Sequence, residues 1–215
     1  MNRRQITSPG RIEAGETIMS GLVAQIPIAG ADSVPFITRS YDDARRLWRH
    51  QRSGIERAFT ARGLKALYAV PWPPQCLYST KPIARIGDLR GLRMRTYNRT
   101  TVRIAEMTGA TPVDVPMADV ARALADGRIN TMITSAVTGV DNKVWYGLKA
   151  RGWAASEAAA GEAVEQLRRN GMKIERASAE VLMEIKILGE RFSLEWVRQV
   201  GSEANTIFIP YFTHS

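Results

Sequence analysis

The chain of 215 residues contains a single cysteine, Cys76, and only two histidines, His50 and His214. One cysteine excludes a disulfide within the chain, and so few soft ligands give no cluster of the zinc type. A Cys/His catalytic pair would need one of two histidines to lie beside Cys76 by chance. Since Cys76 lies in the apolar context PPQCLY, we expect a buried thiol rather than a nucleophile. The sequence therefore predicts no metal site and no cofactor.

Long apolar runs are also lacking. No stretch of about 18 apolar residues occurs, so the sequence predicts no membrane-spanning helix. The best apolar stretch, residues 21–31, is broken by Gln25 and Pro27 and lies too far from the start to be a signal-peptide core. The motifs of a nucleophile elbow, a dinucleotide-binding turn, a P-loop and a zinc protease are missing as well. We therefore expect a protein that is not an enzyme.

Acidic residues are too few to balance the basic ones. The chain has 30 Lys and Arg against 21 Asp and Glu, a formal net charge of +9. Such a balance permits binding to nucleic acid or to an acidic membrane. The basic residues are nevertheless interleaved with acids or scattered, and no RNP-like strand or helix-turn-helix pattern is found. A solvated arginine-rich surface is favoured, and a nucleic-acid-binding protein is the weaker alternative.

Hydrophobic residues make up 45% of the chain, which is enough for a core. Apolar residues at helical spacing predict an amphipathic helix over residues 42–62, with Asp42 and Asp43 at its start and Gly63 at its end. The apolar run LKALYAV, residues 64–70, predicts a buried strand. The proline-rich segment PWPPQ after it predicts an irregular loop. Its Trp72 either lines a pocket or plugs the end of the sheet.

Strand and helix patterns then alternate. Strands are predicted at 92–97, 111–115 and 129–133, and helices at 100–108 and 118–126. This alternation predicts a parallel sheet covered by helices, and hence an α/β fold. In the last third we expect helices at 153–170 and 178–200, with a short edge strand at 172–174 between them.

The apolar stripe of the long last helix is expected to pack, and the tail TIFIPYFTHS is expected to be an improvised end. The stripe comprises Leu182, Ile185, Leu188, Phe192, Trp196 and Val200. In the tail, the side chains expected to be exposed are Ile207, Phe208, Ile209, Tyr211 and Phe212.

Arg95 lies near the downstream end of the strand in GLRMRTYN, residues 91–98, where open α/β sheets bind ligands. An arginine inside a strand needs an anionic partner, and its planar fork matches a carboxylate through two parallel hydrogen bonds. Two other interpretations stay open: an ion pair with a protein carboxylate, or a side chain that leans out to water. The hydroxyl-rich stretch 134–139, at the same sheet edge, supplies either ligand donors or an ordinary helix cap.

Several segments resemble the solute-binding subunits of TRAP transporters, the tripartite ATP-independent periplasmic carriers of organic acids. The resemblance covers about Gly10 to Gly201. In family order, the segments are DSVPFI, YAVPWPPQ, GDLRGLRMRTYN, GATPVDVPMADVARALADGRIN, TMITSAVTGVDNKVW, RGWAASEA and EQLRRNGMKI. Compared with the family, the chain joins the pattern late and lacks a segment after Trp145. We therefore expect an N-terminally truncated and internally deleted relative.

The resemblance implies a periplasmic-binding-protein-like fold with two lobes, of which the first is incomplete. It divides the chain into a partial first lobe at 1–73, a second lobe at 74–149 and C-terminal bracing helices with the tail at 150–215. Its implied function is to capture an organic acid and hand it to the membrane permease subunits of the transporter in the periplasm. The alternative is a non-functional remnant of such a protein. We also expect the chain to self-associate, because the missing segments leave sheet edges and helix faces without their partners.

The resemblance also implies a binding site. In the family, the arginine at the position of Arg95 clamps the substrate carboxylate. The other residues expected around the ligand are Tyr97, Trp72, Asn98, Thr134 and Ser135.

Overall fold

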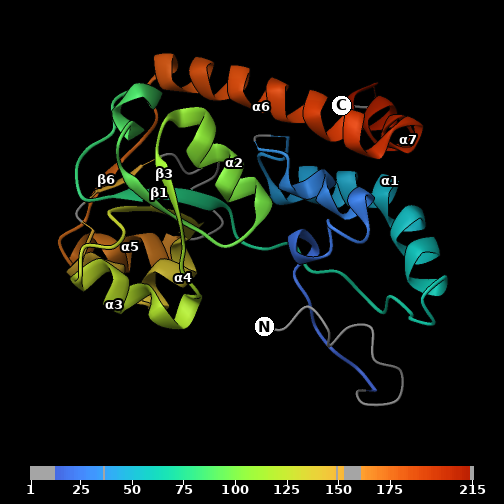
Figure 1. Cartoon of the computed structure of the whole chain (residues 1–215), viewed down its shortest axis with the longest axis horizontal. Helices are drawn as coiled ribbons and strands as arrows, with labels where there is room; N and C mark the ends of the chain where they lie inside the picture. Colours follow the sequence, from blue (N-terminus) through green and yellow to red (C-terminus); the bar gives the residue numbers. More distant parts are fainter. Residues whose placement is uncertain (1–12, 36, 149, 153–160, 214–215) are drawn as a thin grey trace.

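A computed structural model describes residues 13–35, 37–148, 150–152 and 161–213. The molecule has two parts (Figure 1). The part on the left is a β-sheet with helices on both of its faces, and the part on the right is a cluster of helices. The long helix α6, Ala179–Val200, runs over both parts. None of the helices in these ranges combines the length and the apolar character that crossing a membrane requires.

The sheet has six strands in the order β3-β2-β4-β1-β5-β6. Five strands run in one direction, and β1 alone is reversed, because it pairs antiparallel with both β4 and β5. The α/β class is confirmed, but the purely parallel sheet expected from the alternation is wrong for β1. The strands are β1 Gln75–Ser79, β2 Arg93–Thr96, β3 Thr111–Asp114, β4 Thr131–Ser135, β5 Ala150–Gly152 and β6 Lys173–Glu175.

The strand predicted at 64–70 is not formed. Residues 64–74 are neither helix nor strand, and Leu67, Tyr68 and Val70 are 69%, 81% and 73% exposed. An apolar run becomes a strand only when neighbouring strands take up its backbone groups, and none of the described strands pairs with this segment. The strand that enters the sheet is β1, whose start directly after Pro74 concealed it in the sequence.

The other predicted helices and their signals are largely confirmed. Ser40 caps α1 by accepting a hydrogen bond from the Asp43 amide at 3.0 Å, and Ser178 caps α6 in the same way. Gly109 ends α2 with φ of 74°, a conformation that favours glycine. The helices besides α6 are α1 Tyr41–Thr60, α2 Arg99–Thr108, α3 Val120–Ala125, α4 Ala136–Asp141, α5 Gly161–Arg169 and α7 Ser202–Thr213. Short 3-10 turns are η1 Met19–Gly21, η2 Pro27–Ser33, η3 Ile86–Leu89, η4 Met117–Asp119 and η5 Val144–Tyr146.

Only part of the helix predicted at 153–170 can be compared, because residues 153–160 lie outside the described ranges. Its second half is α5, which ends just before Gly171, and the short edge strand after it is β6. The predicted stripe of α6 is correct for Ile185, Phe192 and Trp196, which are buried. Leu182 is 55% exposed, and its neighbour Val181 is buried instead. In the first turn of α6, the buried face therefore includes residue 181 rather than residue 182.

The tail is a helix rather than an improvised end. In α7, Ile207, Phe208 and Tyr211 are buried, so the prediction that they are exposed is wrong. Only Ile209 and Phe212 of that set stay exposed. The Tyr211 hydroxyl donates a hydrogen bond of 2.6 Å to the carbonyl of Ile37. Helical spacing places three of these side chains on the face of α7 that packs on α1 and η2. The tail is apolar at most positions, so its sequence does not show which side chains share a face.

Helix α6 contacts both parts of the molecule. Near its start, the Glu184 carboxylate accepts a hydrogen bond of 2.6 Å from the amide of Ile86. Near its end, the Trp196 indole donates to the carbonyl of Pro27 at 3.2 Å. The division into two lobes and bracing helices stays a prediction, and the sheet itself extends past residue 149 through β5 and β6.

The two faces of the sheet carry separate hydrophobic clusters. On one face, Tyr78 and Met132 pack with residues of α3, α4 and α5; on the other, Leu77 and Met94 pack with α2. A third cluster joins η2 and α1 to the second half of α6 and to α7. Successive residues of a strand point to opposite faces. Arg95, next to Met94, therefore lies on the face that carries Tyr78 and Met132.

Candidate functional site

One edge of the sheet gathers the chain segments that the sequence singled out. Strands β2, β3 and β4 run in parallel, so their carboxyl ends meet there. Because β1 is reversed, it begins at this edge, where Gln75 pairs with Ser135 and Cys76 pairs with Thr134. At this edge the ends of β2, β3 and β4 thus lie near the start of β1, and β5 and β6 end on the same side of the sheet.

Arg95 is buried at this edge, with 2% of its surface exposed. Its Nε donates a hydrogen bond of 2.9 Å to the carbonyl of Val115, the residue after β3. Its Nη1 is buried and has no hydrogen-bond partner. In the described ranges, no carboxylate lies within ion-pair distance of Arg95. Neither the ion-paired arginine nor the solvated one that the sequence left open matches this arrangement.

A buried guanidinium with an unpaired donor is costly. Burial lowers the pKa of Arg95 below its usual value, while Tyr97 and the carboxylate of Asp114 partly oppose this shift. Arginine nevertheless stays charged at any physiological pH. The site therefore presents a fixed positive charge with at least one N–H group available for an anion.

The aromatic ring of Tyr97 covers the guanidinium. The Arg95 Cζ lies 4.8 Å from the centre of that ring, within the range of a cation–π contact. Tyr97 is 39% exposed, so its outer side faces solvent. Desolvation nevertheless raises the pKa of its hydroxyl, and the nearby positive charge of Arg95 acts in the opposite direction.

Thr134 shares the face of Arg95. In the ladder between β2 and β4, Arg95 pairs with Met132, and Thr134 lies two residues further toward the carboxyl edge. Since the side-chain period of a strand is two, all three side chains lie on one face. Thr134 is 4% exposed, and its partner across β1 is the buried Cys76. The expected burial of the Cys76 thiol is confirmed.

Asn98 and Ser135 act as helix caps. The Asn98 side-chain oxygen accepts a hydrogen bond of 2.8 Å from the amide of Thr101 at the start of α2. The Ser135 hydroxyl accepts one of 3.1 Å from the amide of Thr138 at the start of α4. These are the bonds of the helix-cap interpretation. A ligand contact for either residue stays a prediction.

Trp72 is 61% exposed, three residues before β1 enters the sheet edge. Its predicted place after a strand is wrong, because residues 64–70 form none. It still precedes the start of β1, which lies at the edge of Arg95, so its ligand contact stays a prediction.

Sequence reasoning missed the Val115 carbonyl and the position of Gln75. Val115 ended a predicted strand that runs parallel to the strand of Arg95. The rule that the carboxyl ends of parallel strands share an edge could have placed its carbonyl beside the arginine. Gln75 carried no such signal, because β1 was not recognised as a strand.

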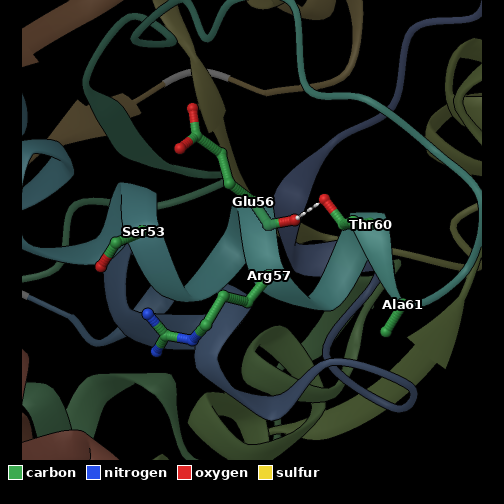
Figure 2. A pocket seen from close by; sticks show the side chains of 5 residues that line it. All are labelled: Ser53, Glu56, Arg57, Thr60 and Ala61. Atoms are coloured by element: carbon green, nitrogen blue, oxygen red, sulfur yellow. Dashed lines mark hydrogen bonds between the residues drawn. The ribbon is translucent and has the colours of Figure 1, made fainter.

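A separate open hollow of about 570 Å³ lies on the surface of α1 and contains none of these residues. Figure 2 shows its lining, where Thr60 donates a hydrogen bond of 2.8 Å to the carbonyl of Glu56. Arg57 in the same hollow pairs with Glu203 at 2.9 Å. The Glu56 carboxylate pairs with Arg52 at 2.7 Å, so the two charged side chains of the hollow are engaged with the protein itself. In the part of the chain that the structure describes, no three His, Cys, Asp or Glu residues gather as metal ligands.

A comparison with protein families shows to which family the chain belongs. Residues 5–144 match the family described as bacterial extracellular solute-binding protein, family 7, DctP. The chain belongs to this family. Among curated proteins, none matches the chain significantly.

Solved structures of extracytoplasmic receptors resemble this DctP-family chain over nearly its whole length. DctP7 of Bordetella pertussis, which binds pyroglutamic acid, has 27% identity and a TM-score of 0.90, covering 98% of this chain and 83% of its own. A pyroglutamate-specific TRAP solute-binding protein from a marine metagenome has 29% identity and a TM-score of 0.87, covering 98% and 82%. DctP6 of B. pertussis, another receptor of pyroglutamic acid, has 26% identity and a TM-score of 0.83, covering 91% and 78%.

These matches confirm the family predicted from the sequence and its periplasmic-binding-protein-like fold. The family and these relatives are solute receptors rather than enzymes, as expected. The protein is therefore a solute-binding protein of the TRAP type, and nucleic-acid binding is not favoured. Its family is extracellular.

Proposed function

We propose that this protein captures a small organic acid with a single carboxylate at Arg95 and hands it to the membrane permease of a TRAP transporter in the periplasm. The observation that carries the proposal is the guanidinium of Arg95, which is 2% exposed, anchored through Nε and unpaired at Nη1. A carboxylate is the ligand whose geometry and charge match this group.

The charge around Arg95 supports a ligand with one carboxylate. The side chains that share its face at the edge, Met132, Thr134 and Cys76, are uncharged. A second ligand carboxylate would be buried there without a cation, which is costly. Two relatives with 27% and 29% identity are receptors of pyroglutamate, an acid with one carboxylate. We therefore take pyroglutamate as the first candidate ligand.

The energetics allow useful affinity. Each hydrogen bond to a charged group contributes about 1.5–3 kcal/mol net, so two of them from Arg95 contribute about 3–6 kcal/mol. Burial of the carbon skeleton adds to this. A micromolar dissociation constant corresponds to roughly 8 kcal/mol, so burial of the carbon skeleton has to contribute about 2–5 kcal/mol net.

The test is calorimetric titration of pyroglutamate, lactate and succinate against the parent and three variants. Arg95→Lys keeps the charge but loses the planar fork, and Arg95→Ala loses both, so affinity for a monocarboxylate should fall stepwise, by about tenfold and then a hundredfold or more. The matched control is Arg93→Ala, in the same strand, because Arg93 is exposed and donates to the carbonyl of Gly127 at 2.9 Å. It should bind like the parent.

Equal affinities of the parent and Arg95→Ala would refute the carboxylate clamp. Tighter binding of succinate than of either monocarboxylate would refute the proposed ligand class. A folded parent that binds no acid in the panel would favour the remnant.

A further inference from the structure

The guanidinium of Arg95 is held in place, and the groups around it block the approach of a ligand. The Arg95 Nε is held by the carbonyl of Val115 at 2.9 Å, and the buried Nη1 has no protein partner. With 2% of Arg95 exposed, a carboxylate in solvent cannot reach Nη1 while the surrounding groups keep this arrangement. Some covering group has to move before the ligand can bind.

The side chain of Tyr97 covers the guanidinium of Arg95 and has room to rotate. Its ring lies over the guanidinium, 4.8 Å from Cζ, yet 39% of the residue is exposed. In the described ranges, its hydroxyl has no hydrogen-bond partner, so a rotation of the ring breaks no bond of that kind. The ring is restrained by its contact with Arg95 and has solvent on its outer side.

The backbone below the ring is anchored. The Tyr97 amide donates to the hydroxyl of Thr101 at 3.1 Å, and the cap between Asn98 and Thr101 fixes the turn into α2. Side-chain rotation about χ1 and χ2 is therefore the motion that this site allows, whereas displacement of the main chain would break the cap.

The geometry points to Tyr97 as an aromatic gate that controls the entry of the ligand. Its ring alternates between lying over the guanidinium of Arg95 and swinging out toward solvent, and only the second arrangement admits a carboxylate to Nη1. This inference rests on the proposed function, since it concerns the approach to the same cation.

A gate lowers the association rate by the fraction of time that it is open. A cation–π contact of the partly desolvated kind favours the covered arrangement by roughly three- to thirtyfold. Removal of the ring sets the open fraction to one. The association rate constant for a small carboxylate should rise by the same factor.

The experiment is stopped-flow binding of pyroglutamate to the full chain, with Tyr97→Ala, Tyr97→Phe and Tyr146→Ala as variants. Tyr97→Ala should associate about three to thirty times faster than the parent. Tyr97→Phe keeps the ring and should match the parent. Tyr146→Ala, the matched control, removes a tyrosine that is 79% exposed and should also match the parent.

An association rate of Tyr97→Ala within twofold of the parent, or slower, would overturn the gate. If that variant fails to fold, Tyr97→Leu replaces it, because an aliphatic side chain loses the cation–π contact with Arg95. Tyr97→Leu should associate faster than Tyr97→Phe, and equal rates for these two variants would overturn the gate.

Failure of the gate and failure of the binding site give different results. A parent that binds pyroglutamate and loses it in Arg95→Ala, with equal rates for the parent and Tyr97→Ala, refutes the gate alone. A parent without binding to any carboxylate refutes the proposed function and the gate with it.

Discussion

The Arg95 Nε and the carbonyl of Val115 are joined by a hydrogen bond of 2.9 Å between β2 and the end of β3. This bond satisfies one donor of a buried cation and leaves its Nη1 unpaired. The site is thus arranged for an anion at the expense of the stability of the fold. Such a trade-off between binding and stability is common at functional sites.

Arg95→Met should unfold at a higher temperature than the parent when no ligand is added. An apolar side chain of similar length removes a buried charge without a counterion, which is neutral or stabilising by about 1–4 kcal/mol in comparable cases. Added pyroglutamate should raise the melting temperature of the parent but not of Arg95→Met. Differential scanning calorimetry measures both effects. A variant that melts well below the parent without ligand would show that Arg95 is a structural residue.

Ile207→Ala should destabilise the protein by about 2–5 kcal/mol, because it opens a cavity where α7 packs on the core. Ile207 is fully buried, whereas Ile209 in the same helix is 58% exposed. Ile209→Ala is therefore the matched control, with an expected change within about 0.5 kcal/mol. Urea unfolding followed by circular dichroism gives both values. Equal effects of the two substitutions would contradict the packing of α7 described above.

Asp32, in η2, should make the fold less stable as pH rises from acid to neutral. Although the residue is exposed at the surface, desolvation of its carboxyl raises the pKa from 3.8 to about 6, and a hydrogen bond from Ser33 partly opposes the shift. The folded state therefore holds this proton more tightly than the unfolded state does. The resulting stabilisation is complete below pH 3.8 and is lost as pH rises through about 6.

Asp32→Asn removes this titration, so its advantage in free energy of unfolding over the parent should grow between about pH 4 and 7 and then level off. Because Asp32 keeps contact with solvent, we expect a gain below about 1 kcal/mol. Urea unfolding of both proteins at a series of pH values checks this. A difference that shrinks with rising pH would contradict the raised pKa.

Leu67→Lys combined with Val70→Lys should reduce self-association. Both side chains lie in the irregular segment 64–74 and are 69% and 73% exposed, next to the exposed Tyr68 and Trp72. Exposed apolar side chains on an extended segment favour association with other chains. Sedimentation velocity at tens of micromolar compares the double variant with the parent. A parent that is monomeric under these conditions would contradict the prediction.

Local signals determined most of the helices. Ser40 and Ser178 are cap residues whose hydroxyls accept hydrogen bonds from the amides three residues further on, and Gly109 adopts the left-handed conformation at the end of α2. Each effect involves residues a few positions apart, so it can be derived from the chain alone. The face of β2 that carries Arg95 follows from the two-residue period of a strand in the same way.

Pairing over long distances was decided only by the tertiary structure. Residues 64–70 have the composition of a strand but lack a pairing partner, whereas Gln75–Ser79 became a strand by pairing with β4 and β5. Composition measures the tendency of a segment to pair and carries no information on which partner is available. The burial of Ile207, Phe208 and Tyr211 likewise depended on α1 and η2, far away in the chain.

The binding site divides in the same way. The sequence by itself placed Arg95 near the carboxyl end of a strand in an alternating strand–helix pattern, because strand boundaries and the two-residue period follow from local patterns. Its burial, its bond to Val115 and the ring of Tyr97 over its guanidinium became visible only in the folded chain. Desolvation and contact geometry depend on all the atoms that surround a group, and only the tertiary structure brings those atoms together.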